Sequence, residues 1–389
     1  MSMFSDRWFA SARYLLLLLM SLVMLAACTG RPVGSAPPTP TATAAPTATP
    51  TTPAPTATAT AMPTPTATAT ATATPAPTAT VTATPAPTAT PAPTATPDPV
   101  AGLTIPALRA LRYGAGELVI GERYAGGPGY TTYRMTYPSV DGLRLTGLLH
   151  LPDGTGPFPV LIANRGYIAP ERYQPGMDSR VFSDYAAQRG YLVVAPDYRG
   201  YGGGDAGPNA FYTGYYLDVL SLIPLVQRLP MAREGKVGMW GHSRGASITV
   251  AALTLSDQLA AAVVYAPAPA DLAVDYARRF QQSGGDPGTE TWPFSPERDP
   301  DAYRRVSPLT YLGTAQAPVM LHHGTADTTV ASSASIVIAE TLRAAGKDVT
   351  LHLYEAGPHT LTGAQEQLYL ERSLTFFDQH LRVLDTNEN

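Results

Sequence analysis

The chain has 389 residues, of which 14% are charged, and a formal net charge of −4. Its Lys and Arg residues are not clustered, so the composition gives no sign of a nucleic-acid-binding surface. The single cysteine, Cys28, excludes an intrachain disulfide and a metal site made of cysteines.

Residues 1–28 have the pattern of an export signal. Arg7 and Arg13 precede the apolar run 14–27, which ends in small residues and is shorter than the roughly 20 residues that a membrane-spanning helix needs. The ending Leu-Ala-Ala-Cys28 resembles the bacterial lipoprotein box, in which the cysteine becomes the lipidated first residue of the mature chain. We therefore expect an exported protein at the cell envelope or cell surface, anchored in the membrane through a lipid on Cys28. A plain cleaved signal and an uncleaved anchor are the alternatives.

Residues 29–102 consist largely of Pro, Thr and Ala. A segment of this composition cannot bury a core, and its prolines favour extended conformations. We expect a disordered stalk that holds a folded domain away from the membrane anchor. Stretches rich in Thr and Pro can carry O-linked sugars, and the sequence does not decide whether this one does.

A folded domain is expected over residues 103–384, which is enough chain for one α/β domain with a large core. Alternating segments at 131–137 and 143–151, joined by the turn 139–142, predict an N-terminal antiparallel hairpin. Near-continuous apolar strands follow, separated by helical segments, at 159–163, 191–195, 237–240, 260–265, 318–322 and 349–354. Because such strands are buried on both faces, the sequence predicts a mostly parallel central sheet with helices on both faces.

The stretch Gly241-His-Ser243-Arg-Gly245 fits the pattern G-x-S-x-G and lies between an apolar strand and an apolar helix. The two glycines let the backbone turn tightly enough to lift Ser243 above the edge of the sheet. A helix that begins right after Ser243 points its first N–H groups at the site. We expect Ser243 to be a nucleophile and the Arg244 N–H to bind a developing oxyanion. A serine in an ordinary strand-to-helix turn is the alternative.

Asp327 and His359 also follow predicted strands, and the carboxyl ends of parallel strands gather at one edge of the sheet. The chain order Ser, Asp, His is that of α/β-hydrolases, so the sequence predicts this fold. In a triad, His359 takes the proton of Ser243, while Asp327 fixes the imidazole tautomer and stabilises the imidazolium. An ordinary loop or N-cap aspartate is the alternative for Asp327.

A second oxyanion donor is expected in the loop 164–167, after the strand 159–163. Gly166 permits a tight turn there, so the Tyr167 N–H is the candidate, with its neighbours next. An ordinary strand-to-helix loop is the alternative.

These residues resemble the catalytic domain of the prolyl oligopeptidase family of α/β-hydrolases. The resemblance rests on residues 193–202, 238–245, 303–310, 321–330 and 357–359. It implies a serine hydrolase or peptidase and gives the triad roles to Ser243, Asp327 and His359. The chain departs from the family in two ways. The β-propeller of the family's peptidases has no counterpart here, and Ala246 stands where a second glycine is common.

Residues 266–317 interrupt the rhythm of strands and helices and are expected to form a lid over the site. The candidates for a substrate pocket are His242, Tyr276, Trp292 and Phe294. The remaining histidines are expected to be packing or surface residues. The acidic residues of the segment could meet a cationic substrate group, although a solvated lid surface is favoured.

The sequence thus predicts a serine hydrolase that cleaves ester or amide bonds through an acyl-enzyme, without a cofactor or metal. Esters are favoured over peptides, because restriction to short peptides in the family depends largely on the propeller. The expected partners are a small ester or short peptide and the membrane, and the sequence does not fix the oligomeric state. The alternatives are a prolyl oligopeptidase-like peptidase and a non-catalytic binding domain on a hydrolase fold.

Overall fold

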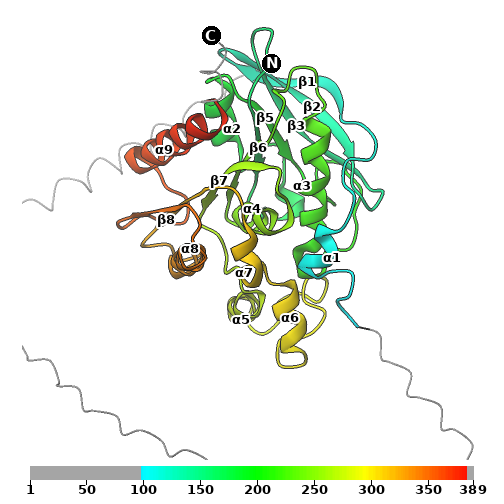
Figure 1. Cartoon of the computed structure of the whole chain (residues 1–389), viewed down its shortest axis with the longest axis vertical. Coiled ribbons are helices and arrows are strands. Elements are labelled where there is room, and N and C mark those ends of the chain that lie inside the picture. Colours follow the sequence, from blue (N-terminus) through cyan, green and yellow to red (C-terminus); the bar gives the residue numbers. More distant parts are fainter. Residues whose placement is uncertain (1–97, 383–389) are drawn as a thin grey trace, which may run out of the picture. The chain divides into compact units, whose positions relative to one another are not determined.

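The computed structural model describes residues 98–382. Within this range lies one sheet of nine strands in the order β1-β2-β3-β5-β4-β6-β7-β8-β9 (Figure 1). The strands are β1 (Val119–Gly127), β2 (Tyr130–Pro138), β3 (Arg144–Pro152), β4 (Val160–Asn164), β5 (Leu192–Pro196), β6 (Val237–His242), β7 (Leu259–Tyr265), β8 (Val319–Gly324) and β9 (Val349–Tyr354).

The pairs β1–β2, β2–β3 and β3–β5 are antiparallel, whereas every other neighbouring pair is parallel. This confirms the predicted α/β-hydrolase fold, with a mostly parallel sheet and antiparallel strands at its N-terminal side. The predicted hairpin is β2–β3. The sequence did not predict β1, because nearly all of its residues are exposed and no alternation of buried and exposed positions marks it.

Helices cover both faces of the sheet. One face carries α2 (Arg180–Ala187) and α9 (Gly363–Leu381), and there Phe182 stacks on Trp240 of β6 with ring centroids 4.5 Å apart. The neighbouring Met239 faces the other cluster of buried side chains, because successive strand residues alternate between faces. The helices that contribute to that second cluster include α1 (Ile105–Arg109), α3 (Thr213–Val226), α4 (Arg244–Leu255) and α8 (Ser333–Ala344).

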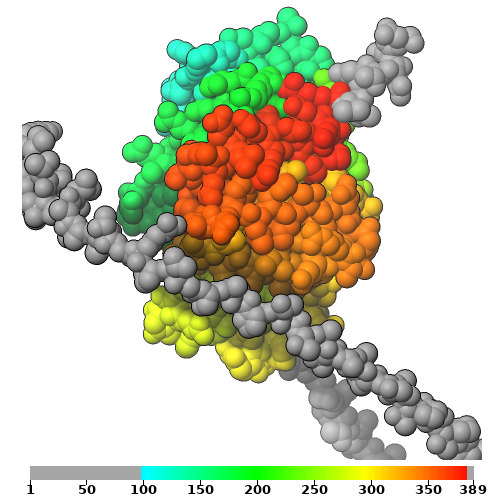
Figure 2. Space-filling view, turned by 90° about the vertical axis from the view of Figure 1, so that its left-hand side faces the viewer, coloured from blue at the N-terminus to red at the C-terminus, as the bar shows by residue number. Residues whose placement is uncertain are grey.

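The connection between β7 and β8 holds a group of short helices, which Figure 1 shows together and apart from α9. They are α5 (Leu272–Gln282), α6 (Pro300–Val306), α7 (Pro308–Tyr311) and the 3₁₀ turn η3 (Leu312–Thr314). Two further 3₁₀ turns are η1 (Pro170–Arg172) and η2 (Ala210–Tyr212). Figure 2 shows the face of α8 and α9 in orange to red, with the yellow α5–α6 segment at its lower end.

The expected export signal, the stalk and Cys28 lie outside the described residues, so these remain predictions. Among residues 98–382, no helix has the length and apolar character needed to cross a membrane.

Candidate active site

Ser243 lies in the turn between β6 and α4, at the carboxyl edge of the parallel strands. Its backbone has φ 53° and ψ −117°, a strained conformation for a residue with a side chain. A Cβ atom on Gly241 would lie 2.2 Å from the Gly245 oxygen, and one on Gly245 would lie 2.0 Å from the Asn164 oxygen. Only glycine fits at these two positions, which explains the G-x-S-x-G pattern.

The structure brings Ser243, His359 and Asp327 together. His359 Nε2 is 3.0 Å from Ser243 Oγ, and His359 Nδ1 is 2.6 Å from Asp327 Oδ2. The side chain of Asp327 is fully buried, whereas that of His359 keeps 18% of its surface exposed. A base at the solvent boundary, held from behind by a buried carboxylate, can take a proton from the serine and return it to a leaving group.

Asp327 accepts four hydrogen bonds. Two come from histidine rings, His359 Nδ1 and His323 Nε2 (3.1 Å), and two from the backbone N–H groups of Thr329 (2.8 Å) and Val330 (2.9 Å). Burial acts to raise the pKa of Asp327, but these bonds hold the pKa well below its usual range. The carboxylate therefore stays ionised and can stabilise a positive charge on His359.

The two backbone N–H groups predicted as oxyanion donors belong to Arg244 and Tyr167. Arg244 is the first residue of α4, so its N–H has no acceptor within the helix. The loop after β4 approaches the nucleophile, since a Cβ atom on Gly166 would lie 3.2 Å from the Cβ of Ser243. The Gly166 N–H already donates to Asp178 Oδ2 at 2.5 Å. The next N–H, of Tyr167, has no partner among residues 98–382.

His242 was predicted as a pocket residue, and the structure corrects this. Its side chain is 4% exposed, with Nδ1 2.8 Å from Asp178 Oδ1 and Nε2 3.2 Å from the backbone oxygen of His359. Both ring nitrogens are occupied by protein partners. His242 therefore lies beneath the candidate base and does not face a substrate.

The aromatic pocket predicted in the lid segment is also corrected. Tyr276, Trp292 and Phe294 surround Tyr303, with ring centroids 6.0, 6.1 and 5.9 Å from its own. Tyr303 is 1% exposed and Trp292 is 3% exposed. Trp292 and Tyr303 therefore belong to the hydrophobic core, together with Phe211. Tyr276 and Phe294 pack against this core and are half-buried, so the four predicted residues do not form one aromatic pocket.

An apolar pocket of about 420 Å³ lies elsewhere, between α5 and α8. Its wall includes Val330, three residues after Asp327, together with Val274 of α5 and Val337 of α8. The guanidinium-bearing Arg278 also lines it. Through Val330, this pocket adjoins the loop that carries Asp327.

Two residues of the site were not predicted. His323 was expected to be a packing residue, yet it donates to Asp327; the signal that could have identified it is a histidine in an apolar strand, four positions before the aspartate. Asp178 bonds both His242 and the Gly166 N–H. It belongs to no motif and contacts His242 across 64 residues of sequence, so pattern alone could not identify it.

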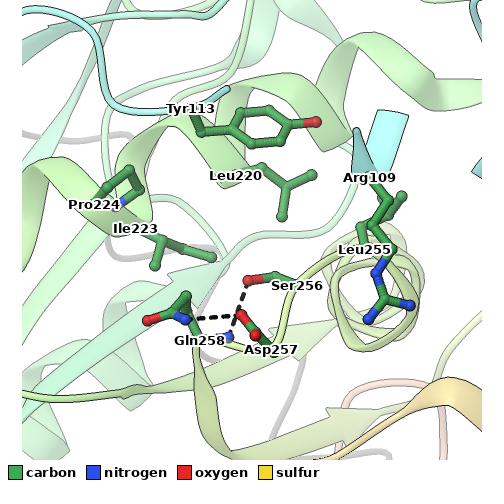
Figure 3. A pocket seen from close by; sticks show the side chains of 9 residues that line it. All are labelled: Arg109, Tyr113, Leu220, Ile223, Pro224, Leu255, Ser256, Asp257 and Gln258. Carbon is green, nitrogen blue, oxygen red and sulfur yellow. Dashed lines mark hydrogen bonds between the residues drawn. The ribbon is translucent and has the colours of Figure 1, made fainter. Parts of the chain in front are cut away.

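Another cavity, of about 350 Å³, lies at the C-terminal end of α4, remote from Ser243 (Figure 3). Tyr113 and Leu220 line it, and Gln258 Nε2 donates to Asp257 Oδ1 at 2.7 Å in its wall. No triad residue takes part, so it is separate from the candidate active site. Across residues 98–382, no group of three or more His, Cys, Asp or Glu side chains is placed to hold a metal ion.

Comparison with known proteins places these residues in a family. The sequence profile of the prolyl oligopeptidase family matches residues 179–383, which include Ser243, Asp327 and His359. The chain is 29% identical to the uncharacterized peptidase YtmA of Bacillus subtilis over 236 residues, which are 58% of this chain and 85% of that protein.

Solved structures show the same fold at low identity. The acylaminoacyl peptidase of Pyrococcus horikoshii has a TM-score of 0.55 at 22% identity, over 65% of this chain and 42% of that one. The chain thus spans less than half the length of that peptidase. Acetyl xylan esterase 1 from Thermoanaerobacterium sp. has a TM-score of 0.54 at 18% identity, over 70% of this chain and 92% of that one. With the profile matching more than half of its residues, this serine hydrolase belongs to the prolyl oligopeptidase family.

Proposed function

We propose that the enzyme hydrolyses esters of small carboxylic acids through an acyl-enzyme, with Ser243 as nucleophile, His359 as general base and Asp327 as the carboxylate that orients the base. The observation that carries this proposal is the continuous chain of hydrogen bonds from Ser243 Oγ through His359 to Asp327, at 3.0 and 2.6 Å. The strained turn at Ser243, which presents the hydroxyl at the end of β6, also supports it.

Acylation begins when Ser243 Oγ bonds to the carbonyl carbon of the substrate and its proton passes to His359 Nε2. The carbonyl oxygen becomes an oxyanion, which accepts hydrogen bonds from the N–H groups of Arg244 and Tyr167. When the tetrahedral intermediate collapses, the bond to the leaving group breaks. The departing alcohol or amine takes the proton from His359 and leaves an ester on Ser243.

Deacylation repeats these steps with water. His359 takes one proton of the water while its oxygen attacks the acyl carbon, and the bond to Ser243 Oγ then breaks. The proton on His359 returns to Oγ, so the carboxylic acid leaves and the enzyme is restored. Throughout, the ionised Asp327 stabilises the imidazolium form of His359.

The surroundings of the site support the proposed preference for esters. The apolar pocket lined by Val274, Val330 and Val337 suits an aliphatic or aromatic group of the substrate. Among the described residues only α1 precedes β1, so they hold no second domain that would select the amino end of a peptide. An activated ester also has a better leaving group than an amide.

A peptidase is the second candidate, because the B. subtilis relative is named a peptidase and the family is that of prolyl oligopeptidase. The two candidates differ in which class of substrate is cleaved with the higher kcat/KM. We expect short-chain 4-nitrophenyl esters to be cleaved at least about tenfold faster than aminoacyl or prolyl 4-nitroanilides, a difference of about 1.4 kcal/mol in barrier. Efficient anilide cleavage with negligible ester turnover would restore the peptidase. Ser243→Ala is the control and should remove both activities.

We also propose that the enzyme works at the cell envelope, held by a lipid on Cys28 and a stalk over residues 29–102. The apolar run before Cys28 and the Pro/Thr/Ala composition after it support this.

Residues 266–317 serve as the lid of the proposed active site. The bond from Gln282 Nε2 to the Thr329 oxygen, 2.9 Å long, supports this role because it ties the end of α5 to the loop that carries Asp327.

A further inference from the structure

His242 and Asp178 form a second imidazole–carboxylate pair directly behind the triad. The His242 ring lies next to the His359 ring and is tilted relative to it, with the ring centroids 5.0 Å apart. The side chain of His242 is 4% exposed. Its Nδ1 is 2.8 Å from Asp178 Oδ1, and its Nε2 is 3.2 Å from the backbone oxygen of His359. The pair therefore touches the backbone of the residue that acts as base.

The hydrogen-bond partners fix the protonation state of His242. A carboxylate oxygen and a backbone carbonyl oxygen can only accept, so both ring nitrogens must donate. A neutral imidazole carries a single N–H and would leave one of the two contacts without a proton. Because the lowered pKa of Asp178 keeps its carboxylate ionised, the two contacts together call for an imidazolium at His242, with its charge balanced by Asp178.

The electrostatics agree with this geometry. Burial acts to lower the pKa of His242, but the Asp178 carboxylate outweighs it and the pKa is raised above its usual value. Burial likewise acts to raise the pKa of Asp178, and the neighbouring imidazolium and the Gly166 N–H hold that pKa below its usual value. Each member of the pair keeps the other charged.

Asp178 also contacts the loop that carries the proposed oxyanion donor. Its Oδ2 accepts the Gly166 N–H at 2.5 Å, and Gly166 precedes Tyr167, the proposed oxyanion donor. The backbone of Asp178 has φ 69°, a conformation that is unfavourable for a residue with a side chain and is held here by these contacts. One carboxylate thus connects the oxyanion loop, through His242, to the backbone of His359.

We propose that His242 and Asp178 are positioning residues whose ion pair holds the base and the oxyanion loop in place. In the wild-type enzyme, this network is complete only while His242 carries both of its ring protons. The inference rests on the proposed function, because it assigns a role relative to Ser243 and His359. Loss of the proton from His242 would break one of its two contacts and free either the loop or the base.

This predicts a fall in activity at alkaline pH. Because the pKa of His242 is raised, the pair is complete below that pKa and is lost as the pH rises through it. The other ionisable groups around the pair are Arg165, Tyr265, Asp327, His359 and Tyr369. Burial raises the pKa of both tyrosines, and the pKa values of Asp178 and Asp327 are lowered, so none of these four groups changes charge between about pH 6 and 10.

Asp178→Asn gives the sharpest test, because asparagine can rebuild the network around a neutral ring. Its Nδ2 can donate to His242 Nδ1 while its Oδ1 accepts the Gly166 N–H, and His242 Nε2 can still donate to His359. We expect kcat for a neutral aryl ester to fall less than in His242→Gln, and the alkaline fall to disappear up to about pH 10.

His242→Gln removes the cation and leaves the Asp178 carboxylate buried without its partner. Here kcat should fall by about tenfold or more with KM little changed, because the base and the oxyanion donor lose their alignment. His150→Gln is the matched control: His150 is 3% exposed on β3 and outside this network, so the rate and pH profile should match the wild type.

A measurement on the intact protein settles the charge even if His242→Gln does not fold. The full chain has seven histidines, so ¹⁵N-histidine NMR can resolve them, with Asp178→Asn identifying the His242 signals. At a pH above the ordinary imidazole pKa of about 6.5, we expect His242 to be doubly protonated in the wild type and neutral in Asp178→Asn. A neutral His242 in the wild type, or an unchanged alkaline fall in Asp178→Asn, would overturn the inference. Ester hydrolysis that persists in Ser243→Ala would instead overturn the proposed function.

Discussion

Asp327 shows how one carboxylate can organise a catalytic loop. Its Oδ2 accepts from the rings of His359 and His323, and its Oδ1 accepts from the backbone of Thr329 and Val330. All four partners donate, and a carboxylate has acceptors for each of them. The same residue thereby orients the base and closes the turn after β8.

Asp327→Asn should lower kcat strongly, although the two side chains are almost the same size. An asparagine has one acceptor oxygen and one NH₂ group, so it must face at least one of these donors with a donor. Either His359 adopts the wrong tautomer or the turn opens, and we expect kcat for an ester to fall by about 10³–10⁴-fold. Asp301→Asn, at an exposed position of α6, is the matched control and should keep the wild-type rate. A loss below about tenfold would refute this role for Asp327.

At the level of residues, the sequence could indicate those that lie next to strand ends in a known order. Ser243, Asp327 and His359 all have this property, and the structure brings them within hydrogen-bond distance. His323 and Asp178 do not, because their roles depend on which loops meet in space. The same limit explains His242, whose place in the motif suggested contact with substrate although its ring is buried.

At the level of elements, the six strands with apolar sequence patterns were predicted and β1 was not. Five of the six, β4 to β8, are buried on nearly every residue, and this burial on both faces explains their continuous apolar patterns. The sixth, β9, is only partly buried, but its sequence still carries an apolar pattern. β1 is stabilised by its pairing with β2 and is solvated on nearly every residue, so no pattern marks it. Apolar patterns in a sequence indicate which residues are buried, and an edge strand can form without burying its side chains.

The prediction of an aromatic pocket in the segment between β7 and β8 was wrong for a related reason. Its aromatic residues looked like a pocket because large apolar side chains suit both a ligand and a core. The structure packs Trp292 and Tyr303 as stacked rings within the segment itself. The apolar pocket is instead lined by valines of α5 and α8, which are far apart in sequence. A single sequence cannot tell which apolar surface stays open.

At the scale of the whole molecule, one prediction concerns the attachment of the protein to the membrane through Cys28. In a bacterial host, the N-terminal peptide of the mature protein should begin at a lipidated Cys28, and mass spectrometry would detect the added mass. Cys28→Ser should release the protein from the membrane fraction or leave the signal uncleaved, because serine cannot form the thioether. Thr29→Ala, at the next position, should remain membrane-bound. A mature N-terminus elsewhere, without lipid, would count decisively against the anchor.

The most direct test of the account is covalent labelling of the full chain with a fluorophosphonate, followed by peptide mapping. A phosphonate mimics the tetrahedral intermediate and reacts only with a serine that a neighbouring base has activated. We predict a single adduct, on Ser243, that forms in step with the loss of ester hydrolysis and is absent from Ser243→Ala and His359→Ala. An adduct on another residue, or full labelling of Ser243→Ala, would contradict the assignment of Ser243 as the nucleophile.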